Sequence, residues 1–239
     1  MANACERRRF SGRREAAVGL GVYALYLAVR RLKLRRGARA SAAVNAERVV
    51  ALERRLGIHV EPGMQRLLLP RTRLVAALNV AYVTLNVGLT VGWLMYLFRR
   101  RDAEFHRLRR AAVAATLGAQ PVFLFFPVAP PRTLAGFVDT IEEVSGVDLD
   151  RGLVAELYDP IAAVPSIHVA YAVVTAAGIA STARRRHIRA LAPAYPPLVA
   201  LVVLATANHY VVDALAGAVL GRLALRAASG GRGIVGRPG

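Results

Sequence analysis

The chain has 239 residues, of which 55% are hydrophobic, and its formal net charge is +18. A soluble domain seldom combines so much hydrophobicity with so much charge. The arginines also interrupt bilayer-length apolar stretches instead of lining one helix face, which argues against nucleic-acid binding. Apolar runs separated by basic loops are typical of a membrane protein that crosses the bilayer several times.

The apolar runs predict the helices. They cover residues 16–29, 74–98, 111–129, 161–183 and 190–225. A span needs about 20 residues, so the last run is long enough for two spans with a turn near residues 206–210. We therefore expect an all-α polytopic membrane protein with about six transmembrane helices.

No linker divides the sequence, so we expect one membrane domain over residues 1–239. Residues 1–73 hold the N-terminal span and a basic segment, and residues 74–226 form a core helical bundle that contains the motifs described below. Residues 227–239 are expected to be a flexible basic tail.

The basic segment contains an amphipathic pattern. Val49, Leu52 and Leu56 share one face of a helix. The polar residues around them are Glu47, Arg48, Arg54 and Arg55. Such a helix can lie on anionic lipid or form part of a solvated helical hairpin, and the pattern does not distinguish the two.

Counting the membrane crossings places two histidines on the same side of the membrane. His168 opens the fourth apolar run; the chain then crosses, turns through residues 184–189 and crosses back to His209. Asp213 follows one helical turn deeper. Arginine-rich short loops favour the cytoplasm for the opposite side, although the basic residues are too evenly divided to decide. We expect a multi-pass protein of the plasma membrane with this site on the extracytoplasmic face.

His209 and Asp213 are four residues apart, so they meet on one face of a helix. Asp213 is the only acidic residue between Pro160 and the C-terminus. A carboxylate near hydrocarbon is costly and usually has a partner. A carboxylate at one imidazole nitrogen fixes the tautomer and leaves the other nitrogen available as a nucleophile or base.

A second motif, VPSIHVAYA, begins at Val164. Pro165 suits the first turn of a helix, and Ser166 with the amides that follow it then forms a helix N-terminus that attracts phosphate. His168 lies in the same turn, where it can protonate a leaving oxygen. A single histidine at a helix end is commonly a packing residue, so the interpretation depends on the three groups sharing one side. It predicts phosphoryl transfer through a histidine, without a metal or another cofactor.

These residues resemble the type 2 phosphatidic acid phosphatase superfamily, which has a Pro-Ser-x-His element at a helix start and a later His-x-x-x-Asp. The HYVVD form at residues 209–213 is closest to the branch of inositol phosphorylceramide synthases and sphingomyelin synthases, which are inositolphosphotransferase-like. The resemblance implies that His209 is the nucleophile that forms a phosphohistidine. Asp213 would then orient it, and His168 would be the acid for the leaving group.

The chain also departs from the family pattern. Phosphatases have a Ser-Arg pair shortly before the second histidine, where this chain has Val202 and Val203. The family's first motif, a lysine followed by Arg-Pro, is not evident. Arg132, in PVAPPRTLAGF, stands where that motif belongs, so we expect Arg132 and Ser166 to bind phosphate. The departures favour the transferase branch.

The sequence therefore predicts an integral membrane phosphotransferase that moves a phospho-headgroup between a lipid and an acceptor alcohol. Its partners would be a phospholipid or lipid phosphate, a hydroxyl acceptor or water, and membrane lipids, with no nucleic acid. One alternative is a phosphatase acting on phosphatidate or polyprenyl phosphate, and another is a non-catalytic transporter or scaffold with the same fold. The acidic residues between 139 and 159 are interpreted as a solvated loop, and His59 has no assigned role.

Overall fold

A computed structural model of the protein describes residues 10–35, 37–146 and 159–230. The all-α prediction is confirmed for these residues, in which the only β-type pairing is an isolated parallel bridge between Val128 and Ala162. The predicted tail begins inside a helix that continues to Ser229, and its residues 231–239 lie outside the described part of the chain.

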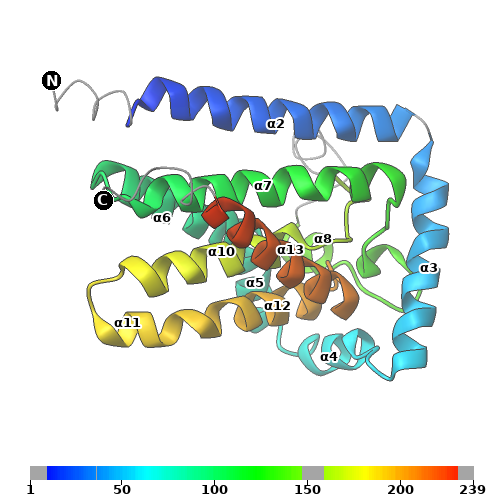
Figure 1. Ribbon diagram of the computed structural model, residues 1–239. Helices are drawn as coiled ribbons and strands as arrows, with labels where there is room; N and C mark the ends of the chain where they lie inside the picture. The colour runs from blue at the N-terminus through cyan, green and yellow to red at the C-terminus, as the bar shows by residue number, and fades with distance from the viewer. Residues whose placement is uncertain (1–9, 36, 147–158, 231–239) are drawn as a thin grey trace, which may run out of the picture.

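The helices follow the predicted runs closely (Figure 1). In chain order they are α2 Gly12–Arg35, α3 Ala38–Leu56, α4 Glu61–Leu68, α5 Thr72–Val80, the π-helical segment η1 Ala81–Leu85, α6 Asn86–Arg99, α7 Glu104–Phe125, the 3-10 segment η2 Pro131–Thr133, α8 Thr140–Ser145, α10 Ile167–Thr182, α11 Arg186–Leu191, the 3-10 segment η3 Ala192–Ala194, α12 Tyr195–Ala205 and α13 Val211–Ser229. The predicted turn at residues 206–210 lies between α12 and α13.

Six membrane spans are not confirmed. In the described residues one helical stretch, Arg186–Ala205, is long and apolar enough to cross a membrane, with 20 residues. Val87–Arg99 and Ile167–Thr182 are apolar but shorter. The fourth predicted run is shortened because its helix starts only after Ser166, and the charged residues of α2 and α7 lower the hydropathy of those helices.

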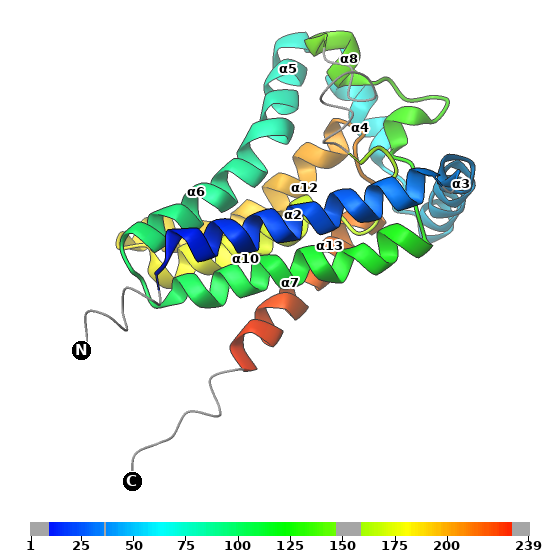
Figure 2. The same cartoon turned by 90° about the horizontal axis from the view of Figure 1, so that it is seen from above.

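Helix α10 is the centre of the bundle and packs against α6, α7, α12 and α13. Helix α2 lies along α7, and α3 runs across the end of the bundle (Figure 1). Seen from above, α6 and α5 lead away from the bundle toward α8, which packs on α5 (Figure 2). The first turns of α10 and α13 lie close together, and α13 also contacts α3.

Two glycines let α13 approach α10 closely. A Cβ at Gly217 would be 2.2 Å from the backbone oxygen of Ser166, and one at Gly221 would be 2.7 Å from that of Ala170. Small residues spaced by four are a common means of bringing two helix backbones together in membrane proteins. Here they hold the N-terminus of α10 against the first turns of α13.

Helix α3 includes the residues of the amphipathic pattern, and the protein covers only part of the predicted apolar face. Leu52 and Leu56 are 44% and 59% exposed, whereas Val49 is buried. The buried face also contains polar residues because it contacts backbone segments at the end of the bundle: the Asn45 amide donates to the Pro127 carbonyl at 2.9 Å. Whether the exposed leucines lie on lipid stays a prediction.

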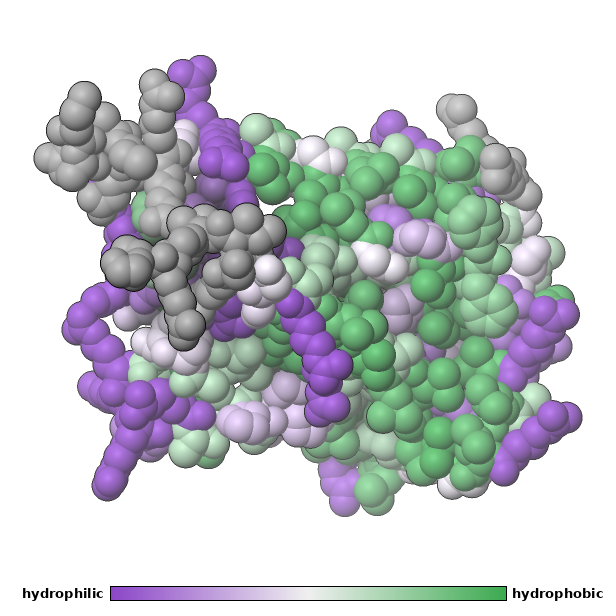
Figure 3. All heavy atoms as spheres, viewed as in Figure 1, coloured by the Kyte–Doolittle hydropathy of each residue, from purple (hydrophilic) through white to green (hydrophobic). Residues whose placement is uncertain are grey.

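Exposed apolar side chains support a membrane environment for the bundle. On α13, Leu215, Val219 and Leu223 are four residues apart and each is more than half exposed. Figure 3 shows apolar side chains over much of the middle of one face, with hydrophilic ones gathered toward its ends. A large exposed apolar surface with polar ends is expected for contact with lipid.

Replacing Gly217 by Ala should destabilise the protein by about 1–3 kcal/mol, because the new methyl group forces α13 away from α10. Gly92→Ala is the matched control, since Gly92 lies in α6 with open space around its Cα. Thermal unfolding in detergent measures both. Equal melting temperatures for Gly217→Ala and the wild type would contradict the close approach of the two helices.

The predicted orientation can be tested with single cysteines in a Cys5→Ser background. Ala135 is exposed in the loop beside the 206–210 turn, and Arg185 is exposed at the other end of α10. A membrane-impermeant maleimide should label Ala135→Cys in intact cells and Arg185→Cys only after permeabilisation. The reverse pattern would place the site in the cytoplasm.

Candidate active site

His209 lies in the turn before α13 and Asp213 in its first turn, and both are buried. His209 Nδ1 is 3.2 Å from Asp213 Oδ2, and the Tyr210 N–H donates to the same oxygen at 2.9 Å. One carboxylate therefore caps the start of the helix and orients the imidazole. With Nδ1 held in this way, Nε2 is the nitrogen left for chemistry.

His168 approaches the pair from α10. Ser166 is the N-cap of this helix, and its Oγ accepts from the Val169 N–H at 3.4 Å. His168 is the second helical residue, and its ring centroid is 5.7 Å from that of His209. The structure thus brings together the three residues that sequence reasoning placed on one side.

Tyr82 is a residue of the site that sequence reasoning missed. It comes from the π-helical segment η1, and its ring stacks on His168 with centroids 4.7 Å apart. Segments of π-helix often occur at functional sites because they displace one side chain from the regular helical positions. No motif surrounds Tyr82, so only its three-dimensional position identifies it.

The segment that contains Arg132 is hydrogen-bonded to the turn before α13, which carries His209. The Arg132 N–H donates to the Ala207 carbonyl at 2.8 Å, two residues before His209. The guanidinium group is almost fully buried and forms an ion pair with Asp139. The structure places Arg132 next to the turn but engages it with a carboxylate, which a bound phosphate would have to displace or share.

The interpretation of residues 139–159 as a solvated loop is wrong at two positions. Asp139 pairs with Arg132, and Asp159 Oδ2 is 2.7 Å from Nζ of Lys33, with both side chains buried. Glu142 and Glu143 are exposed as expected, whereas Asp148, Asp150 and Glu156 lie outside the described residues. A charge buried beside hydrocarbon requires such a partner.

The tyrosine of the HYVVD motif connects the turn before α13 to neighbouring segments. Tyr210 is fully buried, and its hydroxyl donates to the Ala129 carbonyl at 3.0 Å. The Ala129 N–H in turn donates to the Ala42 carbonyl of α3 at 3.1 Å. The motif thereby connects the turn before α13 to the 126–139 loop and to α3.

Two glutamates from the N-terminal third complete the surroundings of α13. Glu61 Oε1 accepts from the Val211 N–H and Glu53 Oε1 from the Val212 N–H, both at 2.8 Å. Burial raises the pKa of the Glu53 carboxyl to about 8; the hydrogen bond from Val212 opposes this rise, and the nearby Glu61 adds to it. Sequence reasoning missed both residues because they lie in a segment that is otherwise strongly basic.

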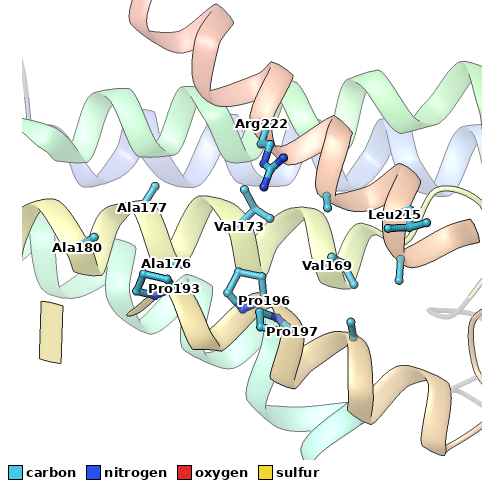
Figure 4. Close-up of a pocket in the computed structure, with 13 residues that line it drawn as sticks. Val169, Val173, Ala176, Ala177, Ala180, Pro193, Pro196, Pro197, Leu215 and Arg222 are labelled. Atoms are coloured by element: carbon cyan, nitrogen blue, oxygen red, sulfur yellow. The ribbon is translucent and has the colours of Figure 1, made fainter. Parts of the chain in front are cut away.

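A groove of about 500 Å³ lies between α10, α12 and α13 (Figure 4). It starts beside Val169, the neighbour of His168, and continues along α10 to Ala180. Its lining is small and branched apolar residues and prolines, with one cation, Arg222. Its shape and lining fit a hydrocarbon chain.

The described part of the chain is therefore a helical bundle in which the imidazole rings of His168 and His209 meet beside the buried Asp213. The family model of the PAP2 superfamily matches residues 47–227, which is most of the chain, and the chain belongs to this superfamily. No curated protein and no solved structure matches the chain significantly.

Membership has direct consequences. The superfamily carries out phosphatase and phosphotransferase chemistry on lipid phosphates, with water or an alcohol as acceptor, and its proteins are typically membrane-associated. The match does not distinguish the inositol phosphorylceramide and sphingomyelin synthase branch from the rest of the superfamily.

Replacing His209 by Ala should abolish turnover, because it removes Nε2, the nitrogen left for chemistry when Asp213 holds Nδ1. Asp213→Asn keeps an acceptor for the Tyr210 N–H but presents an amide to the imidazole, which should lower the rate by about 10²–10⁴-fold with little loss of folded protein. His187→Ala, at an exposed position of α11, is the control. Lipid product and helical content are measured together, and full activity of His209→Ala would exclude a covalent role.

Proposed function

We propose that this protein is an integral membrane phosphotransferase that transfers a phospho-headgroup from a lipid to an acceptor alcohol. The observation that carries the proposal is the imidazole of His209, held by a buried carboxylate and facing a second imidazole. A buried His–Asp pair of this kind produces an oriented nitrogen nucleophile.

In the first half of the reaction, Nε2 of His209 attacks the phosphorus of the donor lipid. The N–P bond forms, the bond between phosphorus and the leaving oxygen breaks, and His168 gives its proton to that oxygen. Asp213 stabilises the positive charge that develops on the His209 ring. The products of this half are a phosphohistidine and a lipid alcohol.

In the second half, His168 accepts the proton of an acceptor hydroxyl while the hydroxyl oxygen attacks the phosphorus. The N–P bond breaks, and the electron pair returns to Nε2 of His209. His168 is protonated again, as it was at the start. The same two imidazoles therefore alternate as acid and base, and protons and charges balance over the cycle.

The first turn of α10 and Arg132 would bind the phosphoryl oxygens. Free N–H groups and the helix dipole make the start of a helix attractive for a phosphate group. Arg132 supplies a guanidinium whose geometry suits phosphate, and Asp139 holds its segment in place beside the turn. The buried Ser166 fixes where α10 begins and so where these amides lie.

The groove between α10, α12 and α13 supports a lipid as the donor. Its apolar lining begins at Val169, so a hydrocarbon chain in the groove would leave its polar end near His168. A purely structural scaffold has no need for a groove that ends near His168 or for a buried Asp213. For this reason we favour an enzyme over a transporter or scaffold.

The positions of Val202 and Val203 support transfer over hydrolysis. The Ser-Arg pair of the phosphatases would stand here, but both valines are buried in an apolar cluster with Val169 and Ala172. This part of the site therefore offers hydrocarbon where a phosphatase has a guanidinium. A held alcohol can also out-compete water through its effective concentration.

Adding a hydroxyl lipid to purified enzyme and a phospholipid donor should divert the product from free headgroup phosphate to a new phospholipid. Mass spectrometry of the extracted lipids measures both products in one sample. Donors with phosphoinositol, phosphocholine and phosphatidate headgroups are compared in parallel. Release of inorganic phosphate alone from phosphatidate, whatever alcohol is present, would identify a phosphatase instead.

The rate should be bell-shaped in pH. His209 reacts as the neutral imidazole and His168 donates as the imidazolium, so acid removes the nucleophile and base removes the proton donor. His168→Ala should lose the alkaline limb and keep the acid limb, with a much lower maximum. A rate that stays constant from pH 5 to about 9 would contradict the assignment of two histidines with opposite protonation.

A further inference from the structure

Glu53, His59 and Glu61 form a cluster where α3, the connection to α4 and the start of α13 meet. His59 Nδ1 is 3.4 Å from Glu53 Oε2 and 3.1 Å from Glu61 Oε2. The three ligand-type atoms all lie within 4.8 Å of one another. Both glutamate side chains are fully buried, while the His59 side chain is 12% exposed.

The contacts within the protein leave one of these atoms unsatisfied. Glu61 Oε2 is buried, and no N–H donor of the described residues is aligned with it, although His59 Nδ1 is nearby and the Glu61 carboxyl interacts with that of Glu53. A buried carboxylate oxygen normally has a hydrogen-bond donor or a cation. The unsatisfied oxygen lies within 4.8 Å of ligand-type atoms of the other two residues.

The distances from His59 Nδ1 to the two carboxylates match the coordination sphere of zinc. Zinc bound to imidazole nitrogen and carboxylate oxygen at about 2.0–2.2 Å in a tetrahedron places its ligand atoms roughly 3.3–3.5 Å apart. The two distances from His59 Nδ1, 3.4 and 3.1 Å, are close to this spacing. An imidazole with two carboxylates is also a ligand set that suits a divalent transition metal better than Mg²⁺ or Ca²⁺.

We propose that Glu53, His59 and Glu61 bind one zinc ion, with water as the fourth ligand on the exposed side of His59. The ring of Phe137 packs edge-on against His59, which helps to fix the direction of Nδ1. The ion neutralises two carboxylates that burial otherwise makes costly. It takes no part in the phosphoryl transfer proposed above.

The site would be coupled to α13. The second oxygens of the two glutamates hold the Val211 and Val212 N–H groups, which directly follow His209 and Tyr210. An ion shared by Oε2 of both glutamates would therefore fix α3, the start of α4 and the first turn of α13 to one point. Removal of the ion should loosen this corner of the protein.

Zinc retention by the full-length protein tests the proposal. Tag-free protein in detergent is stripped with EDTA, incubated with a small excess of ZnCl₂, desalted and analysed by mass spectrometry of the elements. The wild type should retain about one zinc ion per chain and melt at a higher temperature with zinc than without it. Millimolar Mg²⁺ should not replace the zinc.

His59→Ala and Glu61→Gln should each bind zinc more than about tenfold more weakly, because each removes a direct ligand. Glu61→Gln keeps an oxygen for the Val211 N–H, so it separates the loss of the ligand from the loss of the helix cap. His187→Ala is the matched control and should retain zinc as the wild type does. His209→Ala should also retain it, which separates this site from the proposed catalysis.

Two results would overturn the proposal. One is the absence of retained zinc in the folded wild type. The other is equal zinc content in the wild type, His59→Ala and Glu61→Gln. Neither result would bear on the phosphotransferase reaction, because the metal content is measured without turnover.

Discussion

The geometry of this protein depends on Asp213, which joins both histidine segments. Its Oδ2 contacts His209 Nδ1 and accepts the Tyr210 N–H, while its backbone carbonyl accepts the N–H of Ser166, the N-cap of α10. Side chain and main chain of one residue thus set the orientation of one imidazole and the position of the helix that carries the other. Gly217, one turn further along α13, permits the short distance on which this arrangement depends.

Several buried charged side chains around the site have a partner within the protein. An uncompensated charge in an apolar interior is costly, so it needs an opposite charge or aligned hydrogen-bond donors. Lys33 pairs with Asp159, Arg132 pairs with Asp139, and Glu53 accepts an amide of α13. These contacts connect segments that are far apart in sequence, and they converge on the end of the bundle where the histidines lie.

Much of this organisation was predictable from sequence, because hydrophobic runs and helix-capping residues act locally. The turn at 206–210 lies between α12 and α13, and Ser166 caps α10 where the VPSIH motif indicates a helix start. The spacing of His209 and Asp213 also predicted their contact, but not its form: His209 lies in the turn before α13, and Asp213 reaches it from the first turn of the helix.

Contacts between distant segments were not predictable in this way. Glu53 and Glu61 reach α13 across more than half of the chain, and neither has a local pattern that names its partner. Periodicity identified the apolar face of α3 but not what covers it, so the burial of Val49 and the exposure of Leu52 could not be told apart. The point at which a helix starts can also depend on a distant segment. The helix of the fourth run starts late because the residues before it pair with the 126–139 loop.

The pair formed by Lys33 and Asp159 has a consequence for the order in which the protein is made. The two residues are 126 positions apart, so α2 leaves the ribosome long before its counter-charge exists. At about 5–20 residues per second, the delay is on the order of ten seconds. During that time the ammonium group has to remain at the water interface or in the translocation machinery. The contact between the end of α2 and Asp159 is therefore a late event in biogenesis, formed only after the segment leading into the first histidine motif has been synthesised.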